Sequence, residues 1–163
     1  MLVLHETIRA YGHPMIRATH RTTFEITKDP YLTPRGDCII GVNADKSADD
    51  LDPRVKDAIR RDDAIIIIVL RAGHVQDIVL AQGSAKLQLS DQRRIVVRKS
   101  AYVEPATLAI RANKAARDIN RVLVDMLREE EELVLDIYIL GLDEIHSPYK
   151  NVGSIINDFP NAG

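Results

Sequence analysis

The sequence predicts an α+β domain, in which a mostly antiparallel β-sheet or curled half-barrel of about eight strands carries one short and one long helix. Three observations predict this class. Stretches with strand composition follow one another across short turns, as in antiparallel sheets. Residues 64–70 (AIIIIVL) are apolar throughout and mostly β-branched, which indicates a central strand covered on both faces. Two other stretches carry apolar residues at helical spacing.

The first three strands are expected over residues 2–11, 18–27 and 37–44. The short segment GHPM between the first two predicts an antiparallel hairpin. The strand over 18–27 alternates between two faces, and one of these faces is polar throughout. That face consists of Thr19, Arg21, Thr23, Glu25 and Thr27. It is therefore either solvated or lines a site.

Asp52 and Pro53 predict the start of the short helix, because Asp caps helices and Pro suits their first turn. Further strands are expected over 64–70, 75–81, 85–89, 95–100 and 133–142. Pro105 opens the long helix, which is predicted to continue to about Arg128 with an apolar stripe at spacings of three and four. The stripe consists of Leu108, Ala112, Ala115, Ile119, Val122 and Met126.

Length and composition limit the class of protein. The chain has 163 residues, of which 45% are hydrophobic and 28% charged, enough for one globular domain. We expect this domain over residues 1–144 and a carboxy-terminal tail over 145–163. We expect no signal peptide, no bilayer-spanning stretch and no internal repeat with a period of about 20 to 50 residues. The expected location is the cytoplasm.

Motifs exclude several familiar functions. Cys38 is the single cysteine, which excludes an intramolecular disulfide and a Cys-rich zinc module. Its alternation with Ile40 and Val42 predicts a buried, inert thiol. The chain contains no Walker A loop, GxGxxG fingerprint, GxSxG elbow or HExxH helix. The five histidines show no familiar ligand spacing, so no metal site is predicted and the cofactor is left unknown.

Charge is segregated along the chain. The formal net charge is −2, from 22 basic and 24 acidic residues. Residues 129–163 contain one basic and eight acidic residues, whereas residues 44–128 contain sixteen basic and twelve acidic ones. The total charge excludes a protein that is basic all over, but a local site for an anion is compatible with it.

Three runs of residues are similar to a known family. They are GHPMIRATHRTT, LTPRGDCIIGVNADKS and IRANKAARDINRVLV. Together they resemble a small archaeal family of uncharacterised proteins, the domain of unknown function number 371, from His5 to about Leu142. The resemblance implies a single cytoplasmic domain in archaea and brings no activity with it. The low counts of Cys and Trp fit a heat-tolerant host.

A polar cluster near the amino terminus is the first candidate site. Its members are His13, Arg17, His20, Arg21, Arg35 and Asp37. The guanidinium groups suit a phosphate or carboxylate, and His20 or Asp37 is the candidate for acid–base catalysis. The alternative is that Arg and Thr side chains simply cover the solvent face of a strand.

The predicted long helix carries the second candidate site. Arg111 and Lys114 begin a basic stripe beside its apolar face, and Asn113 lies within the same turns. These three residues could extend an anion site, if the stripe meets the amino-terminal cluster. The alternative is a solvated helix face whose charges pair locally.

Three functions therefore compete. The first is an enzyme or binding protein for a small anionic, phosphorylated ligand. The second is a nucleic-acid or ribosome-associated module that uses the basic middle of the chain. The third is an assembly protein, in which an exposed edge of the threonine-rich strand pairs two copies into a homodimer. We rank the first ahead of the others, and expect no membrane partner.

Overall fold

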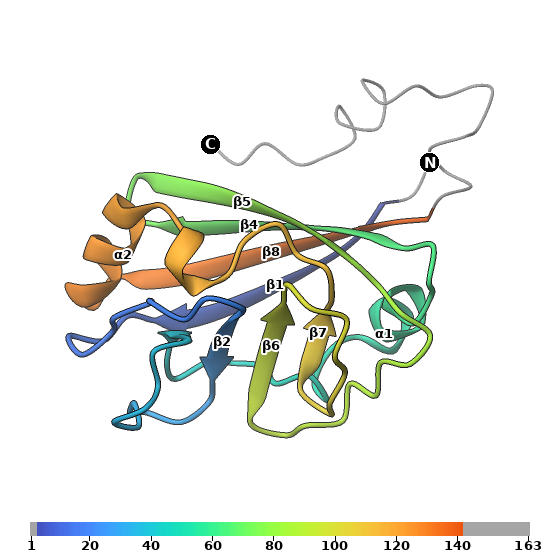
Figure 1. The fold of residues 1–163 in the computed structure, drawn as a ribbon, viewed down its shortest axis with the longest axis horizontal. Helices are drawn as coiled ribbons and strands as arrows, with labels where there is room; N and C mark the ends of the chain where they lie inside the picture. The colour runs from blue at the N-terminus through green and yellow to red at the C-terminus, as the bar shows by residue number, and fades with distance from the viewer. Residues whose placement is uncertain (1–2, 142–163) are drawn as a thin grey trace.

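The structure is a computed structural model that describes residues 3–141, so the predicted tail over 145–163 lies outside the described residues. Within this range, eight strands form two four-stranded sheets, one above the other (Figure 1). Two α-helices complete the fold of these residues. This confirms the α+β class. No helix of this range has the length and apolar character that crossing a membrane requires.

The longer sheet is antiparallel and has the order β1–β8–β4–β5. Its strands are β1 (Leu4–Tyr11), β4 (Ile65–Ala72), β5 (Val75–Gln82) and β8 (Glu132–Leu140). The AIIIIVL stretch forms β4, which lies between two partners as predicted. Ile66, Ile68 and Leu70 on its inner face are fully buried.

The shorter sheet has the order β3–β2–β6–β7. Its strands are β2 (Thr23–Thr27), β3 (Ile39–Gly41), β6 (Arg94–Arg98) and β7 (Thr107–Ala109). The central pair β2–β6 is antiparallel, while β3 and β7 are parallel to their neighbours. Single bridges, Tyr11–Val42 and Gln82–Ile110, connect this sheet to both edge strands of the longer one.

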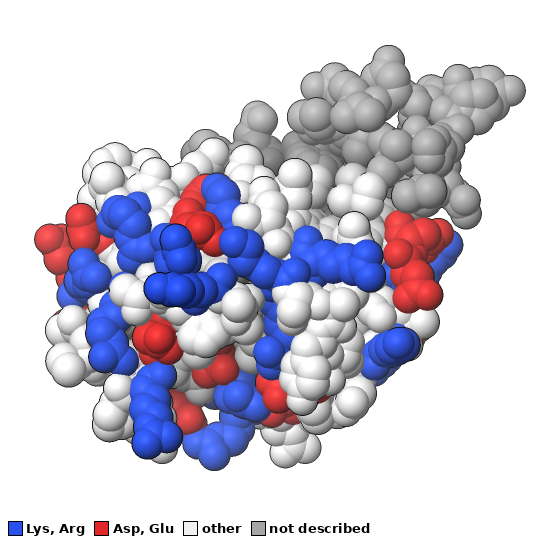
Figure 2. Space-filling model, viewed as in Figure 1, with Lys and Arg blue, Asp and Glu red and all other residues white. Residues whose placement is uncertain are grey.

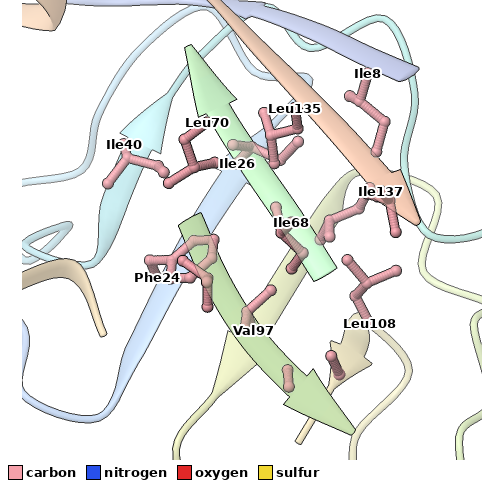
Figure 3. Close-up of a cluster of buried hydrophobic side chains, with 14 of the residues drawn as sticks. Ile8, Phe24, Ile26, Ile40, Ile68, Leu70, Val97, Leu108, Leu135 and Ile137 are labelled. Atoms are coloured by element: carbon pink, nitrogen blue, oxygen red, sulfur yellow. The ribbon is translucent and has the colours of Figure 1, made fainter. Parts of the chain in front are cut away.

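The core lies between the two sheets (Figure 3). Phe24, Ile26 and Val97 from the shorter sheet point toward Ile68 and Leu135 of the longer sheet, and all five are buried. Since the inner face of β2 is apolar, the polar face predicted for this strand is turned away from the core. Thr23, Glu25 and Thr27 are nevertheless buried, which means that loops cover this face.

Both helices start at a side-chain cap. Asp52 accepts a hydrogen bond from the backbone nitrogen of Arg54 at the start of α1 (Pro53–Ile59). Asn120 accepts from the backbone of Val122 and Leu123 at the start of α2 (Arg121–Arg128). Each cap satisfies donors that the first helical turn leaves free. A short 3₁₀ turn, η1 (Ala116–Asp118), precedes α2.

The chain repeats one structural unit twice. The first unit is β1, β2, β3, α1 and β4, and the second is β5, β6, β7, α2 and β8. Each sheet order reads the same when the two units are exchanged. The Tyr11–Val42 bridge corresponds to the Gln82–Ile110 bridge. Residues that precede β3 therefore have their equivalents 71 positions later in the chain. For β3 and the residues that follow it in the first unit, the offset is 68 positions. This repeat of about 70 residues is longer than the periods of about 20 to 50 residues that solenoid and propeller repeats show.

The same backbone hydrogen bonds recur in both units. Asp45 donates to Arg9 O and Asn113 to Leu80 O, each at 2.9 Å. The Lys28–Asp50 ion pair corresponds to the Lys99–Asp118 pair. Asn43 and Arg111 both have a φ of 51°. Below, the counterpart of a residue is the residue at the equivalent place in the other unit.

Three predicted elements differ from the structure. The second helix has only eight residues and begins at Arg121 rather than Pro105. Residues 107–109 form β7, and residues 85–89 form no strand. The expected hairpin between the first two strands is absent, because β1 and β2 belong to different sheets. Ala112 and Ala115 explain the false helical pattern, since they are buried in a non-helical connection.

Candidate functional site

The amino-terminal cluster and the start of α2 meet in the structure. The guanidinium of Arg121 donates to the backbone oxygens of Arg17 at 3.2 Å and Ala18 at 3.0 Å. The backbone nitrogen of Arg117 donates to His20 O at 3.1 Å. Residues 17–20, which precede β2, are thus held against η1 and α2.

A pocket of about 430 Å³ opens beside this contact, and we call it the Arg17 pocket. Its lining residues are Pro14, Met15, Ile16, Arg17, Leu32, Thr33, Pro34, Gly36 and Arg128. The walls are mostly apolar, and two guanidinium groups are the charged groups among them. No acidic side chain is among these lining residues. A pocket of this kind suits a ligand with an anionic group attached to an apolar body.

Backbone oxygens hold the two arginines in place. Arg17 donates from Nη2 to Pro34 O at 2.9 Å. Arg128, at the end of α2, donates from Nε to Ile16 O at 2.8 Å and from Nη1 to Asp125 Oδ1 at 3.1 Å. Asp125 is largely exposed, so its carboxylate neutralises Arg128 only weakly. The pocket therefore keeps a positive potential.

A second pocket, of about 290 Å³, lies on the other side of the loop between β2 and β3, and we call it the Glu25 pocket. It shares Thr33 and Gly36 with the Arg17 pocket. The buried Glu25 projects into it from the polar face of β2, and its carboxylate lies 3.3 Å from Arg94. Burial raises the pKa of Glu25, although Arg94 opposes the shift.

Arg94 and Arg98 of β6 continue this polar layer across the shorter sheet. Arg94 lies 3.5 Å from Asp91 and 3.6 Å from Glu104, and Arg98 pairs with Glu104 at 2.7 Å. Arg98 also packs over the ring of Tyr102. Because each guanidinium here already faces carboxylates, this layer binds the sheet to its loops and leaves less positive charge than the Arg17 pocket offers.

Cys38 lines the Glu25 pocket and is half-buried. Burial, followed by the negative charges of Glu25 and Asp37, raises the pKa of its thiol to about 11. At neutral pH the thiol is therefore protonated and weakly nucleophilic. This agrees with the inert thiol expected from the sequence, although the side chain is less buried than predicted.

The histidines of the amino-terminal cluster have structural contacts. His20 Nδ1 accepts hydrogen bonds from the backbone nitrogens of Thr22 and Thr23, both at 3.2 Å. His13 Nδ1 accepts from Met15 N at 3.0 Å. The backbone oxygen of Asp37 accepts from Thr19 and His20. None of these three side chains lines either pocket, and the catalytic role of His20 and Asp37 stays a prediction.

The other predicted ligand-binding residues are divided among different places. Arg35 lines the Glu25 pocket, whereas Arg21 is exposed beside His20. Lys114 pairs with Asp77, and Asn113 Oδ1 accepts from Leu80 N at 2.9 Å, so both contact β5. Arg111 is exposed on the connection between β7 and η1. The structure thus separates Asn113 and Lys114 from the Arg17 pocket.

Sequence reasoning missed two groups of residues. Arg128 was read only as the end of a helix, although its counterpart Arg60 holds the equivalent backbone in the same way. The second group surrounds the buried Asp136 of β8, which accepts from Thr7 at 2.7 Å and lies 2.9 Å from His5 Nε2. Arg71 of β4 also donates to Asp136. Asp136 and these partners lie on three strands, β8, β1 and β4, so no local sequence motif predicts the group.

Metal ligation is not indicated within residues 3–141. In this part of the chain, no group of three or more His, Cys, Asp and Glu side chains is close enough to hold an ion. A homodimer stays a prediction, but the pairing expected through the edge of the threonine-rich strand does not fit the structure. Strand β2, whose edge was expected to pair two copies, already has β3 on one side and β6 on the other.

Comparison with known proteins places the sequence in one group. Residues 8–140 match the model of a domain of unknown function, DUF371. An uncharacterised protein of Methanocaldococcus jannaschii, MJ0206, is 45% identical over 132 residues, which cover 81% of this chain and 97% of that protein. The matched range contains both pockets and both structural units, except for the first four residues of β1.

Proposed function

Since the chain belongs to the DUF371 family, a family of unknown function with an archaeal member, we propose its function from the geometry: it binds a small ligand with an anionic group in the Arg17 pocket. Arg17 and Arg128 hold the phosphate or carboxylate by charge-assisted hydrogen bonds. Met15, Ile16 and Leu32 contact the apolar part of the ligand.

One observation carries this proposal: two guanidinium groups line the pocket, and no carboxylate does. Elsewhere on the shorter sheet, arginines face acidic partners: Arg94 faces Glu25, and Arg98 faces Glu104. Arg17 donates to a backbone oxygen, and the carboxylate beside Arg128 is the largely exposed Asp125, so both guanidinium groups remain available to an anionic ligand.

The structural repeat supplies a second line of support. Arg128 and its counterpart Arg60 both donate to two successive backbone oxygens, at Ile16 and Arg17 in one unit and at Leu87 and Gln88 in the other. Gln88 is thus the counterpart of Arg17. Because the fold forms equally well around a glutamine at this place, the charge of Arg17 serves something other than folding.

The test measures binding of phenyl phosphate and of inorganic phosphate to the full chain by isothermal titration calorimetry. We expect phenyl phosphate to bind more tightly, since its ring adds apolar contact. The variant Arg17→Gln, which installs the counterpart residue, should weaken phenyl phosphate binding by about tenfold or more, the usual effect of losing a charged hydrogen bond.

Arg21→Gln is the matched control, because it removes the same charge from an exposed position outside the pocket. It should leave phenyl phosphate binding unchanged. Equal loss in both variants, or no binding of either phosphate at millimolar concentration, would contradict the proposal.

A further inference from the structure

Five basic side chains form one continuous surface, which we call the basic face. Its members are Arg21, Lys99, Arg111, Arg117 and Arg121. They are neighbours through backbone contacts: Arg121 donates to Arg117 O at 2.8 Å, and Arg117 N donates to the oxygen of His20, which precedes Arg21. Lys99 N donates to Thr22 O, and Arg111 N to Ser100 O. Figure 2 shows Lys and Arg gathered in a band across this side of the molecule.

Little acidic charge compensates this face. Lys99 pairs with Asp118 at 3.0 Å, and Arg117 lies 4.0 Å from the same carboxylate. Arg121 is bound to backbone oxygens and therefore keeps its full charge. All five residues are exposed.

The structural repeat shows that folding does not require these charges. Their counterparts are Gln92 for Arg21, Lys28 for Lys99, Asn43 for Arg111, Asp49 for Arg117 and Pro53 for Arg121. The second surface is built on the same backbone, yet it carries one cation among these five places and an additional carboxylate. The second surface has its own cations at Arg54 and Arg93, but each of them is paired with a carboxylate, Asp52 and Asp29 respectively. The less compensated positive charge therefore lies on the first surface, as a binding partner there would require.

We propose that the basic face is a docking surface for the phosphate backbone of double-stranded nucleic acid. Four of the five cations are arginines, which bind phosphate oxygens well. All five are exposed, as contact with phosphates requires, although Arg111 also lines two further pockets at the edge of the face. None of the five members is aromatic and the chain has no Trp, while the exposed Tyr102 nearby packs against Arg98, so backbone contact is favoured over base stacking at this face. The inference is independent of the Arg17 pocket, because none of the five residues lines it.

The test uses fluorescence anisotropy of the full chain with a labelled DNA duplex of about 20 base pairs, from about 50 to 200 mM salt. The face variant is Arg21→Gln, Arg111→Asn and Arg117→Asn together. At positions 21 and 111 the new residues copy the uncharged counterparts Gln92 and Asn43. At position 117 Asn replaces Arg instead of the counterpart Asp49, so that the variant loses three positive charges in total. The control variant, Arg9→Gln, Arg54→Gln and Arg93→Gln, removes the same charge from other exposed positions.

We expect wild type to bind with a steep salt dependence, and the face variant to bind at least about tenfold more weakly at low salt. Its slope of log K against log salt should fall by about 2 to 3, since each phosphate contact contributes about 0.9. The control variant and Arg17→Gln should each stay within about threefold of wild type. Each single substitution is measured as well, with circular dichroism to verify folding.

Three results would overturn the inference: no duplex binding by wild type at low salt, equal loss in the face and control variants, or a salt slope that the face variant leaves unchanged. Loss of duplex binding in Arg17→Gln alone would instead assign the duplex to the pocket. Phenyl phosphate binding is unaffected by the face variant if both proposals hold, so failure of one leaves the other testable.

Discussion

His20 and Asp91 accept the same pair of backbone hydrogen bonds in the two units of the chain. Nδ1 of His20 accepts from the second and third residues that follow it, and Oδ1 of Asp91 does the same at 2.8 Å. Their backbone oxygens also correspond, since one accepts from Arg117 and the other from Asp49. His20 is therefore the cap of the turn into β2, as Asp91 is for β6.

This equivalence predicts that His20→Asp keeps the fold and its stability, because a carboxylate already forms this turn in the second unit. His20→Ala should lower the free energy of unfolding by about 1 kcal/mol, the usual cost of a lost cap. Urea unfolding at neutral pH measures both. If His20→Asp were as destabilising as His20→Ala, the two turns would not be equivalent.

Gly12 and Gly83 are counterparts at a close contact with a helix end. A Cβ at Gly12 would lie 1.9 Å from Leu127 O, and one at Gly83 would lie 2.2 Å from Ile59 O. Both obstacles are backbone atoms, which cannot rotate away. We expect Gly12→Ala and Gly83→Ala each to destabilise the protein by about 3 kcal/mol or more, as a core overpacked against backbone does.

Gly141→Ala is the control for these two substitutions, because no atom of residues 3–141 lies within 4 Å of a Cβ built there. Its thermal midpoint should equal that of wild type. A small effect at Gly12 or Gly83 would mean that the helix ends can move away from the strands.

Asp136 should make the protein sensitive to acid. Burial alone would raise its pKa, but hydrogen bonds from Thr7 and His5 and the charge of Arg71 outweigh burial and lower the pKa below 3.8. The stabilisation by this carboxylate is therefore complete above the pKa of the unfolded chain and is lost as pH falls through the folded value. Asp136→Asn should cost about 1 to 3 kcal/mol at neutral pH and show a smaller loss on acidification. Urea titrations from pH 7 to pH 3 test this, and identical pH curves for both proteins would refute it.

Ionisation of Glu25 should change the stability in the opposite direction to ionisation of Asp136. Its pKa is raised from 4.5 by burial, so ionisation costs stability as pH rises from the unfolded value through the folded one. Glu25→Gln removes this cost, while Arg94 keeps Asp91 and Glu104 as partners. We expect the variant to be at least as stable as wild type at neutral pH. A loss of more than about 1 kcal/mol would show that the Arg94 pair outweighs the burial of Glu25.

Cys38 should react slowly with iodoacetamide at neutral pH, because its thiol has a pKa of about 11 and the thiolate is the reactive form. The alkylation rate of the folded protein should continue to increase well above pH 9, where an ordinary thiol has reached its plateau. Mass spectrometry follows the reaction, and the urea-unfolded chain is the control. A plateau near pH 9 in the folded state would contradict the raised pKa.

The fold shows where local patterns suffice and where they fail. β4 was predictable because seven successive apolar residues leave no polar face, and α1 because Asp52 and Pro53 mark its start. The long helix was wrong because Ala112 and Ala115 match a helical stripe equally well when they are buried in a tight connection. Small side chains serve both close packing and helix propensity, so their spacing does not distinguish the two.

The Arg17 pocket was only half predictable. Arg17 stood out as a basic residue in a polar cluster, but Arg128 lies 111 positions further along the chain. The repeat was the available signal, since the segments NADKSADDLD and RANKAARDIN align at matched positions on β3–α1 and β7–α2. That alignment would have placed the second helix near residues 121–128, as the counterpart of α1, but not the contact between its end and the residues before β2.

The sequence by itself determined the α+β class, the central strand, the cap of the first helix and the family, because each depends on neighbouring residues or on runs of identical ones. Only the tertiary structure decided that β1 and β2 lie in different sheets, that Arg17 and Arg128 share a pocket and that one of two equivalent surfaces is basic. The physical reason is that strand pairing and side-chain contacts are chosen by packing between segments far apart in the chain, which local periodicity does not record.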